Sequence, residues 1–407
     1  MWPSVHVSAM THQSKVLTAA QVSEEMTAVL TPPLALEGGI AAEHRAPNLI
    51  QRILSLFHNV RPGSDLTNFQ LPPMFNLPKS HLQLFAEMIY CINDDYLSKC
   101  VEGSSSLERF TAVVAWNLSM IRPPIFGLAP YNPVLGETHH VSRGTLNILL
   151  EQVSHHPPVT ALHATDEDKN IELIWCQHPT PKFHGTTVEA TMDGRRQLKL
   201  ARFDENYEME TPKLLIRILP IPGIEWVGNV RIKCKESGLE ADLCFHKTNP
   251  FLGFGKNSRL VKGKIFYSNS LRTIYEIEGH WDRTVALKDV NSGESRVIYN
   301  AKEAIGKLTP PSIKDPKGLQ PSESVVVWSE VSRSILDKDW GKAREAKRSI
   351  EEKQRELQRE RKSKGEVWVP KHFILRHSKE CGWDCSPIEN VVHEAPIIAP
   401  CPEETRD

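Results

Sequence analysis

Apolar and polar side chains alternate in short runs between residues 138 and 300, and turn residues separate these runs. The clearest run is Leu239–Phe245, where every second side chain is apolar, as in a strand with one buried face. Asp193-Gly194 lies between two shorter runs, Thr187–Ala190 and Leu198–Leu200, and predicts a hairpin. Many strands at this spacing predict an antiparallel sandwich or barrel, and a large barrel can enclose a ligand cavity.

A longer period, close to 3.6 residues, predicts helices on both sides of this region. The first is an amphipathic helix over Asn48–Val60, which Asn48 can cap. The Gly- and Pro-containing segment Arg61–Leu66 follows it as a tether. A helix on such a tether can close over a cavity or lie on a membrane surface, although an ordinary core-facing helix is the alternative. The residues assigned to this lid are Leu49, Ile53, Leu54, Phe57, Asp65 and Leu66.

Two further helices, beginning at Ser80 and near Ser106, have the pattern of scaffold elements. Beyond residue 310, Ile335–Lys364 predicts a charge-rich helix with a sparse apolar seam. Residues 338–364 contain 11 Lys or Arg and 6 Asp or Glu, in a chain whose net charge is -1. The ordinary explanation of such a run is a solvated helix with ion pairs four residues apart.

The periodic segments divide the 407 residues into one predicted domain and two ends. Residues 1–46 are small, polar and rich in helix breakers, so we expect a mostly disordered extension. Residues 377–407 show no periodicity and are expected to form an irregular tail. The domain between them comprises a lid over 47–75, helices over 76–125, the barrel over 126–308 and a C-terminal helical part over 309–376. The predicted fold class is mainly β with helical additions.

Composition narrows the functional classes. A net charge of -1 argues against a chain built for nucleic acid. No run reaches about 18 apolar residues, and the first 21 residues lack the apolar core of a secretory signal. Eight mostly scattered cysteines fit reduced thiols in the cytoplasm. Cys381 and Cys385 have no second pair nearby, so we predict neither a metal site nor a cofactor.

The densest chemistry lies in Glu151–Pro158, which reads E-Q-V-S-H-H-P-P. The apolar run Leu146–Leu150 leads into it as a buried strand, and Pro157 should end that strand. His155 and His156 therefore lie at a strand mouth. Because adjacent strand residues point to opposite faces, both rings can meet one ligand only if the chain turns there. From chemistry alone, a structural role for the pair is the more common outcome.

The eight-residue string resembles the fingerprint of the oxysterol-binding-protein-related lipid-transfer family. Two further motifs follow the same family. Asn132 begins N-P-V-L-G-E, the second motif, although Ala129 stands where many members carry a lysine. Lys347, Glu351 and Arg355 match the third motif, and their spacing places them on one helix face over about 12 Å. W-V-P-K-H-F, over residues 368–373, matches the closing element.

The resemblance implies a short, plant-like member with the ligand domain only. It implies an incomplete antiparallel β-barrel whose apolar tunnel carries a sterol or similar lipid under the lid helix. It also implies exchange of that cargo for phosphatidylinositol 4-phosphate at transient membrane contacts, from the cytoplasm, with the endoplasmic reticulum or Golgi as candidate membranes. The headgroup-binding residues would be Asn132, His155, His156, Lys347, Glu351 and Arg355. The missing lysine at Ala129 removes one cationic contact to that headgroup.

Other functions remain as alternatives. The chain could respond to lipid as a scaffold or sensor, or transfer a phospholipid such as phosphatidylserine. An enzyme using Ser154 and a neighbouring histidine is disfavoured, because no G-x-S-x-G turn surrounds Ser154 and adjacent residues align poorly for proton transfer. A metal site formed by the histidine pairs at 139–140 and 155–156 is equally weak, since partners at fixed spacing are missing. Without the resemblance, the three charged residues of the third motif would be surface ion pairs.

Overall fold

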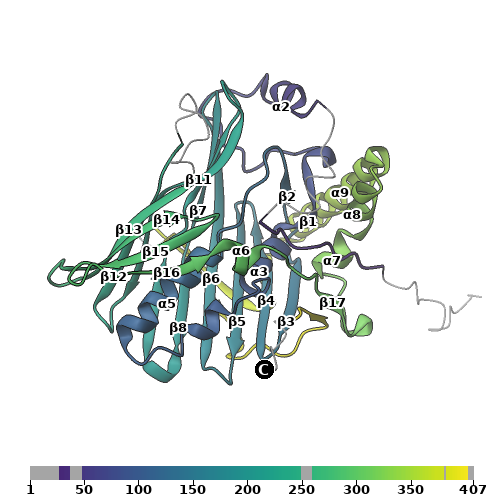
Figure 1. The fold of residues 1–407 in the computed structure, drawn as a ribbon. Helices are drawn as coiled ribbons and strands as arrows, with labels where there is room; N and C mark the ends of the chain where they lie inside the picture. The colour runs from purple at the N-terminus through teal and green to yellow at the C-terminus, as the bar shows by residue number, and fades with distance from the viewer. Residues whose placement is uncertain (1–26, 37–47, 249–258, 380–381, 402–407) are drawn as a thin grey trace, which may run out of the picture.

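Sixteen strands form one curled sheet in the computed structural model, which describes residues 27–36, 48–248, 259–379 and 382–401. The strand order is β16-β15-β14-β13-β12-β11-β10-β7-β6-β5-β4-β3-β20-β17, and β8 and β9 fill a second path between β6 and β11. Neighbouring strands are antiparallel except for the parallel pair β20 and β3. The two sheet ends, β16 and β17, do not pair with each other, so the barrel is incomplete (Figure 1).

The strands of the large sheet are β3 (Thr138–Arg143), β4 (Leu146–His155), β5 (Pro158–Asp166), β6 (Ile171–Phe183), β7 (Thr187–Asp193), β8 (Arg196–Leu200), β9 (Glu205–Met209), β10 (Lys213–Arg217), β11 (Gly223–Cys234), β12 (Leu239–Phe245), β13 (Leu260–Tyr267), β14 (Thr273–His280), β15 (Thr284–Asp289), β16 (Ser295–Asn300), β17 (Ser312–Ile313) and β20 (Ile397–Ile398). Two small sheets pair β1 (Asn76–Ser80) with β2 (Ala129–Tyr131) and β18 (Phe373–Ser378) with β19 (Gly382–Pro387).

Alternating side chains build the core as the sequence predicts. In β12 every second residue from Leu239 to Phe245 is buried, and these residues join one large hydrophobic cluster inside the sheet. Helices α3 and α5 contribute the other side of that cluster, with Trp116 completely buried. Figure 1 shows both helices lying within the curve of the sheet. The barrel interior is therefore lined by strand residues and partly filled by helices.

The helices of the described part of the chain are α2 (Leu49–Phe57), α3 (His81–Tyr90), α4 (Tyr96–Lys99), α5 (Ser106–Ser119), α6 (Ala301–Ile305), α7 (Ser324–Val327), α8 (Ser329–Leu336) and α9 (Trp340–Lys364). Ser80 caps α3 in a reciprocal pair with Gln83. Three details differ from the sequence prediction. Asn48 has a left-handed backbone and makes no side-chain cap, and α2 ends at Phe57. The predicted Ile335–Lys364 helix begins only at Trp340, where Asp339 caps α9.

The predicted hairpin at Asp193-Gly194 is wrong. Strands β7 and β8 do not pair with each other but lie end to end along β6, which is long enough for both. Gly194 is the break between them, with φ of +124°, and the backbone carbonyl of Arg195 accepts a hydrogen bond of 2.7 Å from the N–H of Cys176. The Asp-Gly signal thus marks an interruption in one strand path, because the partner strand continues past it.

The expected irregular tail is also wrong at residues 377–378, 382–387 and 397–398, which form strands. The hairpin β18–β19 packs on the outer face of the barrel, where Phe373 and Cys385 cover Val153 and Val159. Further on, β20 extends the sheet beside β3, and Ile397 is completely buried. These strands are too short to show a period in the sequence, and burial against the barrel stabilises them.

The expected disorder of residues 1–46 fails for residues 27–36, while 1–26 and 37–46 lie outside the described residues. The backbone N–H of Val29 donates to Val325, and that of Leu36 donates to Ile305. Leu34 is buried against Leu77 and Ile125. This segment therefore belongs to the domain, because its apolar side chains pack against the hydrophobic clusters of the barrel and its helices.

Gly194→Ala should destabilise the fold strongly. A Cβ at this position would lie 2.0 Å from the backbone oxygen of Cys176, and its φ disfavours any L side chain. We expect a loss of about 3 kcal/mol or more in urea unfolding. Gly238→Ala is the control, because Gly238 also has positive φ but open space around it, and about 1 kcal/mol is expected there. Equal losses in the two variants would contradict this account.

Candidate functional site

One cavity of ≈ 420 Å³ gathers all six residues that the sequence predicts for headgroup binding. They come from three places: the turn after β2, the end of β4, and one face of α9. The cavity-lining residues that the prediction names are Asn132, His155, His156, Lys347, Glu351 and Arg355. The structure thus brings together side chains that lie more than 200 positions apart in the sequence.

The two histidines turn toward the same cavity. Strand β4 ends at His155 and β5 begins at Pro158, so the chain turns at His156 and Pro157. The centroids of the His155 and His156 rings are 4.6 Å apart. Nδ1 of His155 donates to the backbone oxygen of Pro133 at 3.0 Å. Burial, and then the neighbouring His156, lowers the pKa of His155 to about 4, so the ring is neutral at pH 7. Its Nε2 is then an acceptor, available to a ligand hydroxyl or a protonated phosphate oxygen.

The charged face of α9 is held by its own contacts. Glu351 lies between the two cations, with an oxygen 3.9 Å from Nζ of Lys347 and another 3.6 Å from Nη2 of Arg355. Lys347 is buried, and its Nζ donates to the backbone oxygen of Leu71 and, at 2.8 Å, to Oδ1 of Asn76. Burial lowers the pKa of Lys347 and the nearby Glu351 opposes that shift. Arg355 is more exposed and presents the more accessible positive charge.

Ala129 leaves the expected lysine position without a charge. It lies in β2 beside Asn76, whose Nδ2 donates to the backbone oxygen of Ala129 at 3.2 Å. The ionisable side chains on the cavity wall, apart from the histidines, are therefore Lys347, Arg355 and Glu351. At pH 7 the formal charge of this wall is close to +1, which is small for a site that binds a phosphomonoester dianion.

The predicted lid helix α2 packs on one end of the barrel. Ile53 is buried in a cluster with Phe75, Phe183 and Ile218, and Leu49, Phe57 and Leu66 pack against the same cluster. Leu54 is different, because it is turned outward and exposed.

Beyond the helix, the tether follows the end of β6. The N–H of Leu66 donates to the oxygen of Pro181 at 2.9 Å. Asp65 forms an isolated bridge with Lys182 and accepts from the N–H of Thr67 at 2.8 Å. The hydrogen bonds from the hydroxyl and N–H of Thr67 lower the pKa of the Asp65 carboxyl. Five of the six predicted lid residues thus contact the barrel: Leu49, Ile53, Phe57 and Leu66 through the apolar cluster, and Asp65 through its bridge to Lys182.

Two buried carboxylates hold the walls of the cavity, and the sequence prediction gave them no role. Glu137, from the second motif, accepts from Nε1 of Trp328 at 2.8 Å, from Oγ of Ser324 at 2.6 Å and from the hydroxyl of Ser80. Burial raises its pKa, and these donors oppose the shift.

Glu151, from the first motif, accepts the N–H groups of Lys371 and His372, each at 2.9 Å. It is completely buried and therefore fastens the C-terminal segment to β4. Both glutamates lie within the motif strings, but only their burial shows that they position the site and do not face a ligand.

The cavity has further lining residues that the sequence prediction missed. Gln354 and Gln358 lie on the same face of α9 as Glu351, at three and seven residues along, so helical periodicity could have found them. The segment Thr67–Leu71 also lines the cavity and meets α9 where Lys347 donates to the backbone oxygen of Leu71, and no motif indicated it. The lining is therefore rich in neutral amides and poor in cations.

The geometry also addresses the alternative metal site. His139 binds Glu323 through Nδ1 at 2.6 Å, whereas Nε2 of His140 lies 2.9 Å from the backbone oxygen of His393. Neither is among the residues that line the cavity of His155 and His156. Across residues 27–36, 48–248, 259–379 and 382–401, no group of three or more His, Cys, Asp or Glu side chains is placed to hold a metal ion. Within those same ranges no helix is long and apolar enough to cross a bilayer.

An incomplete barrel with an amphipathic helix packed on one end and a polar cavity lined by α9 is the architecture of a lipid-binding domain of the oxysterol-binding type. The family model for oxysterol-binding protein matches residues 54–391, and the chain belongs to this family. Oxysterol-binding protein-related protein 4B of Arabidopsis thaliana is 52% identical over 373 residues, covering 91% of this chain and 97% of that protein. The family binds and transfers lipids and is not a family of enzymes.

Two solved structures share the fold. The Osh1 ORD domain in complex with cholesterol has a TM-score of 0.70 and 20% identity, covering 88% of this chain and 90% of that chain. The Osh3 ORD in complex with PI(4)P, from Saccharomyces cerevisiae, has a TM-score of 0.64 and 22% identity, covering 89% and 92%. These likenesses confirm the predicted fold class of a mainly β incomplete barrel with helical additions.

Glu151→Ala should destabilise the domain, because it leaves two buried N–H groups, those of Lys371 and His372, without an acceptor. At about 1–3 kcal/mol per unsatisfied group, we expect a loss of roughly 2–5 kcal/mol in urea unfolding. Glu151→Gln keeps one acceptor and should lose less. Glu208→Ala, on the exposed side of β9, is the control and should change stability by under about 0.5 kcal/mol. A fully stable Glu151→Ala variant would show that the C-terminal segment is held by other contacts.

Proposed function

We propose that this protein carries a sterol or similar lipid in its barrel and exchanges it for phosphatidylinositol 4-phosphate between membranes. The single observation that supports this most is the convergence of Asn132, both histidines and the α9 triad on one cavity. Relatives of the same fold are bound to cholesterol in one structure and to PI(4)P in another. The protein would act from the cytoplasm at transient contacts, with the endoplasmic reticulum or Golgi as candidate membranes.

The headgroup would replace contacts that the cavity residues now make with each other. Arg355 can bind phosphate oxygens in a bidentate way, and its present partners, Glu351 and Glu352, are exposed enough to be exchanged. Lys347 would exchange the carbonyl of Leu71 for a phosphate oxygen. The neutral His155 would accept a hydroxyl or share a proton with the phosphate. Glu351 would accept inositol hydroxyls while it holds both cations in place.

The apolar cargo would be enclosed under α2. A sterol that buries roughly 500 Å² of apolar surface gains about 12 kcal/mol before ordering costs, at about 25 cal/mol per Å². The packing of Ile53 against Phe75 and Phe183 closes that end of the barrel. Ile50 and Leu54, one helical turn apart, remain exposed on the same helix. This apolar outer face suits brief contact with a membrane surface.

A phospholipid such as phosphatidylserine is the second candidate for exchange, and Ala129 is the observation that favours it. With a wall charge close to +1, the cavity matches a phosphodiester better than a phosphomonoester dianion. A role as a lipid-responsive scaffold would use the same cavity but would not move lipid between membranes.

His155→Ala/His156→Ala should abolish extraction of phosphatidylinositol 4-phosphate from liposomes and leave sterol extraction largely intact, because a sterol has no phosphate.

Arg355→Ala should weaken phosphoinositide binding roughly ten- to a hundredfold, for one charge-assisted contact of about 1.5–3 kcal/mol. Arg359→Ala, one helical turn further along α9 and well exposed, is the matched control. Ala129→Lys should tighten headgroup binding. A double-histidine variant that loses both lipids equally would indicate a folding role, and one that loses neither would exclude the headgroup site.

Ile53→Ala should speed the release of bound sterol. It removes buried side chain from the contact that holds α2 on the barrel, which costs about 2 kcal/mol or roughly thirtyfold in retention. Gln51→Ala is the control, because Gln51 is exposed on the same helix and belongs neither to the cluster that packs α2 on the barrel nor to its exposed apolar pair. Stopped-flow transfer of a fluorescent sterol to empty liposomes measures both rates. Equal off-rates in the two variants would remove the lid from this mechanism.

A further inference from the structure

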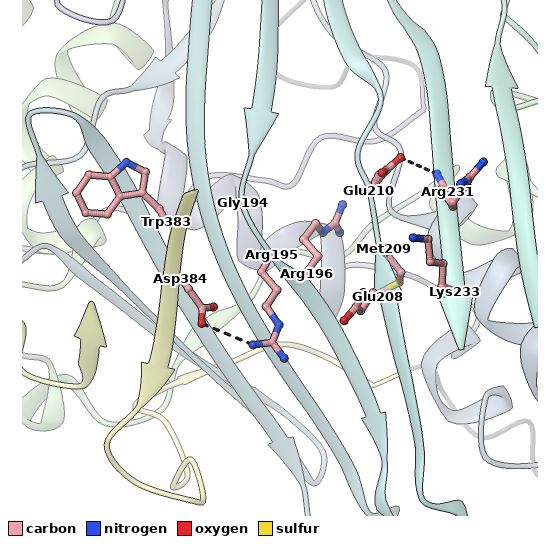
Figure 2. A pocket seen from close by; sticks show the side chains of 10 residues that line it. All are labelled: Gly194, Arg195, Arg196, Glu208, Met209, Glu210, Arg231, Lys233, Trp383 and Asp384. Carbon is pink, nitrogen blue, oxygen red and sulfur yellow. Dashed lines mark hydrogen bonds and ion pairs between the residues drawn. The ribbon is translucent and has the colours of Figure 1, made fainter. Parts of the chain in front are cut away.

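Arg196 is a buried arginine on the inner face of the barrel wall. It begins β8, where Arg196, Leu198 and Leu200 are the buried positions, and Leu198 and Leu200 belong to the interior cluster. The residue is 5% exposed. Figure 2 shows that its neighbour Arg195 extends the opposite way, toward Asp384, with which it forms an ion pair of 3.6 Å. The two arginines therefore face opposite sides of the wall.

The other buried arginines of the described chain have oxygen partners. Arg109 binds both carboxylate oxygens of Glu205, at 2.9 and 2.7 Å. Arg217 pairs with Glu225. The remaining two, Arg122 and Arg143, donate to backbone carbonyls. Such partners compensate the cost of removing a guanidinium from water.

Arg196 has no comparable partner among the residues that the structure describes. Its guanidinium lies over the ring of Trp175, 4.0 Å from the centroid. One terminal nitrogen reaches Oγ1 of Thr211 at a long 3.4 Å, the other reaches Sδ of Met120, a weak acceptor, at 3.4 Å, and Nε has no acceptor among the described residues. Burial lowers its pKa to about 9, which still leaves it protonated at neutral pH. A positive charge thus lies in the barrel without a counter-charge.

Two more donors lie beside it. Trp175 and Trp116 pack with ring centroids 6.4 Å apart, and the Nε1 of each is buried without an acceptor in the described residues. Trp116 is one turn before Met120, which contacts Arg196, so the indoles and the guanidinium belong to one cluster. Unsatisfied buried donors are rare and each is costly. Three such donors in one cluster, one of them charged, are the groups that an oxyanion would satisfy.

We propose that Arg196, Trp175 and Trp116 bind the oxyanion end of an acidic ligand, and that the ligand class is an apolar molecule with one carboxylate. This proposal rests on the proposed function, because such a molecule reaches the cluster through the lipid-carrying interior. The same oxyanion chemistry is offered by free inorganic phosphate. Arg196 also lines a hollow of ≈ 420 Å³ at the break between β7 and β8, whose other charged residues are Arg195, Arg231, Lys233, Glu208, Glu210 and Asp384 (Figure 2). This hollow gives phosphate a separate approach, although its carboxylates oppose an anion.

Titration calorimetry on the delipidated full-length chain tests the site with three probes: oleate, oleyl alcohol and inorganic phosphate. Oleate and oleyl alcohol share one hydrocarbon chain, so their difference reports the carboxylate. Oleate should bind at least about tenfold more tightly than the alcohol. Arg196→Gln should weaken oleate binding roughly ten- to a hundredfold and leave the alcohol unchanged, while Arg196→Lys should retain part of the preference. Arg195→Gln is the matched control and should behave as wild type.

Each outcome of these titrations either supports or overturns the proposal. Equal affinity for oleate and oleyl alcohol, or an Arg196→Gln variant that loses both equally, would overturn the proposal. Binding of phosphate that depends on Arg196 and competes with oleate would support the oxyanion site and assign its approach to the solvent side. Arg196→Gln should melt no lower than wild type, because it removes an uncompensated buried charge. If the wild-type chain extracted neither sterol nor phosphoinositide from liposomes, the proposed function would be contradicted and not the oxyanion site. Variants of Arg196 should leave phosphoinositide extraction intact.

Discussion

The buried carboxylate of Glu137 is the interaction on which the cavity depends. It binds the start of α3 through Ser80, the start of α7 through Ser324, the junction of α7 and α8 through Trp328, and its own turn through the N–H of Val134 at 3.0 Å. Three segments distant in sequence are thereby fixed around one side chain that water cannot reach. α9 follows α8 directly, so its charged face is placed opposite the end of β4. Removing one acceptor here would leave several buried donors unpaired, which is far more costly than removing a surface ion pair.

A second constraint is electrostatic. The cavity combines a neutral His155, a Lys347 already occupied by Leu71 and Asn76, and a glutamate between two cations. The proposed phosphorylated headgroup would therefore compete with internal partners and gain only a small excess of positive charge. In the proposed function this competition would favour exchange over tight retention, because the internal partners that the headgroup displaces would bind again as it leaves. It also explains why the residue at position 129 should influence which headgroup is preferred.

Sequence reasoning succeeded where a pattern is long or a motif is shared. The alternation of Leu239–Phe245 predicts a strand with one buried face, and the four-residue spacing on α9 predicts one charged face; both are present. Sequence reasoning failed where the local structure is determined by contacts with strands distant in the sequence. The strand β20 has two residues and forms only because β3 offers a free edge, and Gly194 becomes a break because β6 runs past it. The hydrogen bond from Lys347 to Asn76 joins residues 271 positions apart, so no local sequence pattern could predict it.

The central claim is that this protein moves lipid between membranes and does not only bind it. A donor-to-acceptor liposome assay tests this directly, with fluorescent sterol in one population and phosphatidylinositol 4-phosphate in the other. The account predicts many sterol molecules transferred per protein, with phosphoinositide moving in the opposite direction and accelerating the sterol. Extraction that stops at one lipid per protein, with no arrival in the acceptor liposomes, would contradict it and favour a lipid-responsive scaffold.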